Sequence, residues 1–257
     1  MSVLTDLAAG LDRGSIEIVD LTSPLSNDTP ILMLPPELGQ TARFELEEIS
    51  RYDERGPAWY WNNFRTGEHT GTHFDAPNHW ATNKDGADIA SVPATAFLRP
   101  ACVLDFTQQV ADDPDFLVEV ADVEAWQQQH GPIPSGGWLL LRTGWSARRT
   151  QEEMTNADDT GPHSPGLSAE CARWVAEQSP AIGIGVETVG TDAGAAHSFD
   201  PAFPCHAMLL GAGKYGLTQL RNLDRLPPTD AMVVATPLPI VSGSGSPARV
   251  LALVERS

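Results

Sequence analysis

The stretch that decides the fold and chemistry of this chain runs from residue 67 to residue 80 and reads Gly-Glu-His-Thr-Gly-Thr-His-Phe-Asp-Ala-Pro-Asn-His-Trp. Three of the seven histidines and one aspartate lie close together here, at His69, His73, Asp75 and His79. Imidazole nitrogens and carboxylate oxygens are the ligands that zinc, manganese and iron share. The segment therefore predicts a metal-dependent enzyme, whereas isolated histidines would more often be ordinary core or surface residues.

No regular element brings these side chains to one ion. In a straight strand, His69 and His73 would lie about 13 Å apart, whereas the ligand atoms of one metal are roughly 3 Å apart. In a regular helix the two histidines would be neighbours, but Asp75 would point away from them. Gly71 allows a turn because glycine adopts a positive φ, and Pro77 stiffens the exit. We therefore expect His69, His73 and Asp75 on one ion, with His79 nearby.

This pattern, His-x-Gly-Thr-His-x-Asp-x-Pro-x-His, resembles the signature of the cyclase family of metal-dependent hydrolases. That family includes bacterial kynurenine formamidase and isatin hydrolase. The resemblance extends along most of the chain, over residues 139–145, 165–168, 183–192, 205–211 and 243–249. It implies that residues 1–257 form a single domain of the swivelling β/β/α type.

One position departs from part of the family. Residues Cys205 and His206 fit the family's Ala-His segment, and twelve residues beyond this histidine the two-zinc formamidases have a glutamate in a Leu-Glu-Gly-Leu run. The corresponding residues here are 217–220, Leu-Thr-Gln-Leu. The loss of a charged ligand weakens the case for a second zinc. The arrangement with Gln219 resembles the single manganese site of isatin hydrolase, with zinc as the alternative metal. An ordinary amide on a helix surface is the alternative interpretation of Gln219.

The expected chemistry is hydrolysis of an amide by metal-activated water, because a divalent ion lowers the pKa of bound water toward neutrality. His79 is the candidate general base by type and placement. His206 is expected to polarise the carbonyl or to hold the product carboxylate. The family resemblance favours opening of isatin to isatinate, and N-formylkynurenine is the alternative substrate. A metal-binding or ligand-binding member that has lost catalysis is the alternative from another functional class.

Large aromatic side chains flank the metal-binding segment. Trp59, Trp61 and Phe64 precede it, and Trp80 follows it. Alternation along a strand would place Trp59 and Trp61 on one face. These four residues are expected to line a flat pocket for an aromatic ring, and core packing is the alternative role.

Composition limits the partners. The chain has 257 residues, of which 41% are hydrophobic and 19% charged, so it can bury a full core. The net charge of −18 argues against nucleic acid and anionic membranes as partners. The sequence shows neither a membrane-spanning run nor a secretion signal, and three widely spaced cysteines suggest reduced thiols in the cytoplasm. We expect a small aromatic amide as substrate and a homodimer or higher homo-oligomer.

Short β-type runs alternate with turns and a few helices, which predicts one α/β domain with a mixed sheet. Strands are expected at residues 16–20, 44–49, 101–106, 138–142, 181–186, 231–235 and 250–254. Helices are expected at residues 120–130 and 168–178, the second with Ser168 as its N-cap. The polar residues 150–165 are expected to form a surface excursion, either a lid or a loop.

Overall fold

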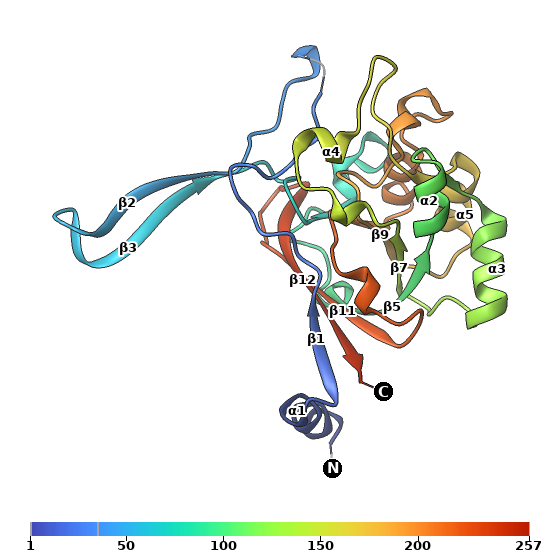
Figure 1. Ribbon diagram of the computed structural model, residues 1–257, viewed down its shortest axis with the longest axis horizontal. Coiled ribbons are helices and arrows are strands. Elements are labelled where there is room, and N and C mark those ends of the chain that lie inside the picture. The colour runs from blue at the N-terminus through green and yellow to red at the C-terminus, as the bar shows by residue number, and fades with distance from the viewer. Residues whose placement is uncertain (1, 35, 257) are drawn as a thin grey trace.

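The computed structural model describes residues 2–34 and 36–256, and a mixed β-sheet forms its centre (Figure 1). Neighbouring strands follow the order β1 (Ile16–Asp20), β12 (Gly245–Glu255), β11 (Ala231–Pro237), β5 (Leu98–Asp105), β7 (Trp138–Arg142), β9 (Gly183–Val186), β10 (Tyr215–Thr218) and β4 (His73–Asp75). β4 pairs with β12 as well, so seven strands close into a barrel and β1 lies outside it against β12. β5, β7, β9 and β10 run parallel, and the other pairings are antiparallel. The mixed α/β class is confirmed, whereas closure into a barrel was not predicted.

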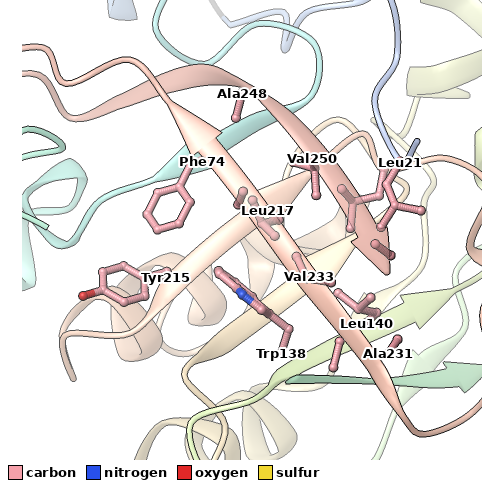
Figure 2. Close-up of a cluster of buried hydrophobic side chains, with 14 of the residues drawn as sticks. Leu21, Phe74, Trp138, Leu140, Tyr215, Leu217, Ala231, Val233, Ala248 and Val250 are labelled. Carbon is pink, nitrogen blue, oxygen red and sulfur yellow. The ribbon is translucent and has the colours of Figure 1, made fainter. Parts of the chain in front are cut away.

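The barrel interior follows from the alternation of side chains along each strand. On β7, Trp138 and Leu140 belong to the inner cluster, whereas Leu139 and Leu141 belong to a second cluster on the other face. Figure 2 shows the inner cluster, in which the ring of Phe74 lies near Trp138. Each fully buried large apolar side chain contributes about 1.5–3 kcal/mol. The inner cluster thereby fixes β4, and with it both residues that flank Phe74.

Helices cover the outer face of the parallel strands. α2 (Thr107–Asp112), α3 (Val120–His130) and α5 (Ala169–Glu177) lie together on one side of the sheet, and α1 (Val3–Arg13) lies beside the end of β1 (Figure 1). Val123 and Val175 supply buried contacts to the second cluster. The hydroxyl of Ser168 accepts the N–H of Cys171 at 3.1 Å, which confirms the expected N-cap. β6 (Leu117–Val118) and β8 (Gly166–Leu167) form a small parallel pair next to these helices.

A two-stranded arm projects from the barrel. β2 (Glu45–Asp53) and β3 (Gly56–Arg65) pair with each other and form a sheet of their own. Figure 1 shows this hairpin extending away from the rest of the chain. Isolated hairpins are marginally stable in water, so a long arm with exposed apolar side chains is typical of a segment that contacts another chain.

The polar stretch 150–165 contains a short helix, α4 (Gln151–Thr155), followed by a loop. Its far end is held at His163, whose Nδ1 lies 2.6 Å from Asp115 Oδ2 and whose Nε2 lies 3.1 Å from Asp158 Oδ1. The stretch is therefore an ordered surface segment, and its role as a lid stays a prediction.

Several predicted elements match the structure. The strands at 16–20 and 138–142 and the helix at 120–130 have the expected bounds. β12 begins five residues earlier than expected, and β3, β4 and β10 were not predicted. Within the described residues, no helix is long and apolar enough to cross a membrane.

Candidate metal centre

A turn and a three-residue strand create the centre. Gly71 adopts the left-handed φ of +65° between the two histidines, as the spacing predicted. The chain then enters β4, where alternation places His73 and Asp75 on one face and Phe74 on the other. β4 pairs with β10 on one side and with β12 on the other, so the backbone of both residues is fixed.

Two imidazole nitrogens converge on one carboxylate oxygen. Nδ1 of His69 lies 2.8 Å from Oδ1 of Asp75, and Nε2 of His73 lies 3.2 Å from the same oxygen. These separations are close to the roughly 3 Å between ligand atoms on a single ion. The side chain of Asp75 is almost completely buried. The structure thus brings the three predicted ligands together, and their role as a ligand set stays a prediction.

Hydrogen bonding orients the ring of His73. Its Nδ1 lies 2.7 Å from the carbonyl oxygen of Gly71 and 2.7 Å from the hydroxyl of Thr218. Because a carbonyl oxygen only accepts, Nδ1 carries the proton in this arrangement. The remaining nitrogen, Nε2, then directs a lone pair toward Asp75. A cation between these atoms removes the repulsion of two acceptors, so the donor set fits a divalent metal.

The charge of Asp75 is favoured by its neighbours. Burial alone would raise the pKa of this carboxyl, but when the nitrogens that face it carry protons, the charge of His73 and the hydrogen bond from His69 outweigh burial and hold the pKa well below its usual range. A divalent cation in place of those protons would favour the carboxylate in the same way. An ionised, desolvated carboxylate attracts a cation strongly.

His79 belongs to the same cluster. Its ring stacks on that of His69, with centroids 3.7 Å apart. Among the described residues, His69, Asp75 and His79 form the one group of three such side chains whose ligand atoms all lie within 4.8 Å of one another. Two candidate ligand sets therefore share His69 and Asp75 and differ in whether His73 or His79 is the third member. The predicted division, with His73 as ligand and His79 as base, stays a prediction.

His206 and Trp80 border the cluster. The ring of His206 lies 4.8 Å from that of Trp80 and 5.4 Å from that of His79, measured between centroids. Asp192 binds His206 through Nδ1 and through the backbone N–H. Burial would lower the pKa of His206, but the hydrogen bond and charge of Asp192 raise it above its ordinary value.

Gln219 directly follows Thr218, whose hydroxyl lies 2.7 Å from Nδ1 of His73. It follows β10 with a left-handed φ of +49°, and it is buried, so the interpretation as an amide on a helix surface is wrong. Its Nε2 donates to the carbonyl of Pro30 at 3.0 Å. The residue borders a cavity of about 130 Å³ that also touches Glu187 and Arg221. Its role as a metal ligand stays a prediction.

The four aromatic candidates separate into two places. Trp80 lies beside His79 and His206, next to the cluster. Trp59, Trp61 and Phe64 lie on β3 of the projecting arm, and between 47% and 59% of each is exposed. The rings of Trp59 and Trp61 contact each other at 6.1 Å, which confirms that they share a face.

Three polar residues near the cluster were not assigned from the sequence: Thr218, Asp192 and Ser244. The hydroxyl of Ser244 lies 2.8 Å from Nε2 of His69. Ser244 belongs to a Gly-Ser-Gly segment 175 positions from His69, and nothing local in the sequence links the two.

Comparison with known proteins agrees with this geometry. Residues 19–193 match the family model described as putative cyclase, which is more than half of the chain. The chain belongs to the cyclase family. The isatin hydrolase of Roseibium aggregatum is 42% identical to this chain over 260 residues, covering 100% of this chain and 98% of the relative. A kynurenine formamidase of Geobacillus thermodenitrificans is 28% identical, covering 79% of this chain and 94% of the relative.

Solved structures give the same relationship. Isatin hydrolase A from Ralstonia solanacearum has a TM-score of 0.97 and 48% identity, covering 99% of this cyclase-family chain and 98% of that chain. An isatin hydrolase bound to the product analogue thioisatinate has a TM-score of 0.96 and 41% identity, with complete coverage of both chains at 100%. The resemblance to the cyclase family is therefore confirmed over the whole chain.

Proposed function

We propose that this chain is a metal-dependent hydrolase that opens the cyclic aryl amide isatin to isatinate. The observation that carries the proposal is the convergence of His69 Nδ1 and His73 Nε2 on Asp75 Oδ1. The similarity to isatin hydrolases over the full chain supports the substrate. N-formylkynurenine is the alternative, because it also presents an anilide-type carbonyl.

His69, His73 and Asp75 hold one divalent ion in this proposal, manganese rather than zinc. When bound, the ion lowers the pKa of a water molecule and polarises the substrate carbonyl. Two imidazoles and a carboxylate suit both metals, so the preference for manganese rests on the family resemblance. Gln219 would join as a fourth ligand through Oε1, because its Nε2 donates to the carbonyl of Pro30.

His79 accepts the proton from the attacking water. Burial and then the charge of His69 lower the pKa of His79 to about 3, so its ring is neutral at pH 7 and one nitrogen has a free lone pair. The same decrease weakens His79 as a base, because a general base acts best with a pKa near the working pH. The carboxylate of Asp75 opposes this decrease and favours the protonated ring once it forms. The same imidazolium can then deliver a proton to the departing ring nitrogen.

His206 holds the carboxylate that the reaction creates. Its raised pKa favours a positive ring, which binds an anionic product better than the neutral substrate. Trp80, beside it, supplies a flat surface for the aromatic ring of isatin.

The arm aromatics take part only through a second copy of the chain. Trp59, Trp61 and Phe64 are exposed on β3, so in a single chain they do not enclose the cluster. We infer a homodimer in which the arm of one protomer covers the site of the other and completes its aromatic wall. Burial of these side chains also removes an apolar surface that a monomer would leave in water.

The test is a direct comparison of substrates. The purified protein, loaded with Mn²⁺, is assayed by absorbance on isatin and on N-formylkynurenine under the same conditions. We expect the higher kcat/KM for isatin. A clear preference for N-formylkynurenine would overturn the substrate and leave the hydrolase mechanism standing, and no turnover of either would favour an inactive binding protein.

Three broader expectations accompany this function. The fold is expected to be of the swivelling β/β/α type in one domain over residues 1–257, and the protein is expected in the cytoplasm. The predicted partners are a small aromatic amide and further copies of the chain, in a homodimer or higher homo-oligomer, without nucleic acid or membrane.

A further inference from the structure

Ser244 lies between Glu68 and His69. Its hydroxyl oxygen is 2.7 Å from Oε2 of Glu68 and 2.8 Å from Nε2 of His69. The backbone N–H of Ser244 also donates to Oε2 of Glu68, at 3.1 Å. Neither Glu68 nor Ser244 has a part in the chemistry derived above.

The direction of these hydrogen bonds follows from counting donors. A carboxylate only accepts, and the serine hydroxyl has one proton, so Ser244 donates that proton to Glu68. The oxygen of Ser244 must then accept from His69, which places a proton on Nε2 of the imidazole. In the neutral ring the other nitrogen, Nδ1, has a free lone pair, and it faces Asp75 Oδ1 at 2.8 Å.

The backbone holds Ser244 in this place. Its carbonyl accepts the N–H of Ala76 at 2.9 Å, and Gly245 pairs with Asp75 in the β4–β12 ladder. A side chain at Gly245 would put its Cβ 2.5 Å from Cε1 of His69 and 2.6 Å from the carbonyl of Phe74. Glycine is therefore required for the segment to approach His69 so closely.

We propose that Glu68 and Ser244 are positioning residues that fix the Nε2–H tautomer of His69 and thereby direct Nδ1 to the metal ion. The proposal rests on the metal site assigned under the proposed function. When a histidine binds a metal through one ring nitrogen, a hydrogen bond from its other ring N–H sets the tautomer and ring orientation and increases the basicity of the ligand. The chain from Glu68 to Ser244 to His69 to Asp75 supplies that hydrogen bond from a segment far away in the sequence.

The effect of Ser244 on the metal site can be measured as Mn²⁺ affinity, which does not depend on enzyme activity. Metal-free protein is titrated with Mn²⁺ by calorimetry, for the wild type, Ser244→Ala and the control Ser242→Ala in the same segment. We expect Ser244→Ala to bind Mn²⁺ about 10- to 100-fold more weakly. Ser242→Ala should stay within about twofold, because surface substitutions rarely change free energies by more than ~0.5 kcal/mol. Wild-type affinity in Ser244→Ala would overturn the proposal.

A double substitution tests whether the two residues act through one chain. Glu68→Ala alone should also weaken Mn²⁺ binding, and it carries the test if circular dichroism shows that Ser244→Ala does not fold. The double variant should bind no more weakly than Ser244→Ala, because both changes break the same path. Fully additive losses would contradict a shared path.

The proton on His69 can be observed directly. In the diamagnetic Zn²⁺ form, ¹⁵N NMR of the ring should show the proton on Nε2, and Ser244→Ala should change that resonance. A proton on Nδ1 in the wild-type Zn²⁺ form would contradict the positioning role of Glu68 and Ser244 and would leave the proposed metal site standing. Failure of the wild type to bind either ion would instead contradict the proposed metal site.

Discussion

Asp192 binds His206 through two hydrogen bonds: its Oδ2 accepts from the ring Nδ1 and from the backbone N–H of the histidine, the latter at 3.2 Å. Its other oxygen accepts the N–H of Cys205 at 2.7 Å. The carboxylate therefore fixes the start of the helical segment Cys205–Leu210 as well as the orientation of the ring.

Asp192→Asn should reduce turnover through His206. The amide keeps the size of the side chain but loses the charge that raises the pKa of His206, and its single accepting oxygen cannot replace both oxygens that bind His206 and Cys205. We expect kcat to fall about 10²-fold, the cost of a misplaced catalytic group, while Mn²⁺ affinity stays unchanged. Steady-state kinetics with metal titration would check this, and an unchanged kcat would show that Asp192 is only structural.

Loss of His163 should change how stability depends on pH. Hydrogen bonds to Asp115 and Asp158 raise the pKa of His163 above its ordinary value. A raised folded-state pKa stabilises the fold fully below the unfolded pKa, and this contribution disappears as pH rises through the folded pKa. The Tm difference between wild type and His163→Gln should thus be largest at about pH 5.5 and shrink toward about pH 8.5. A constant difference, or one as large in the control His197→Gln, would contradict this.

The inner cluster of the barrel should be sensitive to small cavities. Leu140 is completely buried, whereas Leu98, on the neighbouring strand, is 53% exposed. Leu140→Ala should lower the free energy of unfolding by about 2–5 kcal/mol, the usual range for a buried leucine. Leu98→Ala should change it by about 0.5 kcal/mol or less. Urea denaturation measures both, and equal losses would mean that Leu140 does not lie in a packed interior.

Local patterns explain which parts of the fold were predictable. The strand Trp138–Arg142 was predicted with its bounds, because its apolar residues are buried on both faces and form a continuous run in the sequence. The helix Val120–His130 was predicted with its bounds as well. β4 was missed because it has three residues and exists through pairing with β10 and β12. The closure of the barrel was missed for the same reason.

In the candidate site, the residues close together in the sequence were also predictable, and those brought in by strand pairing were not. The cluster of His69, Asp75 and His79 and the turn at Gly71 could be predicted, because all four lie within one short segment. Ser244 could not, since only the β4–β12 pairing brings it to His69. The aromatic residues of β3 show a further limit. Their proposed role in a pocket stays a prediction, and the sequence did not show that the hairpin places them on an arm.

His79→Ala separates the two candidate ligand sets. If His73 completes the ligand set and His79 is the base, His79→Ala should keep its Mn²⁺ and lose about 10²–10⁴ in rate, the span of a general acid–base group. Metal analysis after dialysis, together with the isatin assay, reads both properties. Loss of stoichiometric metal would make His79 a ligand, and activity within a few-fold of wild type would exclude it from proton transfer.

Dependence of isatin hydrolysis on manganese occupancy tests the central claim most directly. Metal-free wild type and His73→Ala are titrated with Mn²⁺ while ring opening of isatin is followed by absorbance. We predict that the metal-free wild type is inactive, that its rate rises in proportion to bound Mn²⁺ and reaches its maximum at one ion per chain, and that His73→Ala neither binds stoichiometric metal nor turns over isatin. Full activity of the metal-free protein, or full occupancy and activity in His73→Ala, would contradict the account.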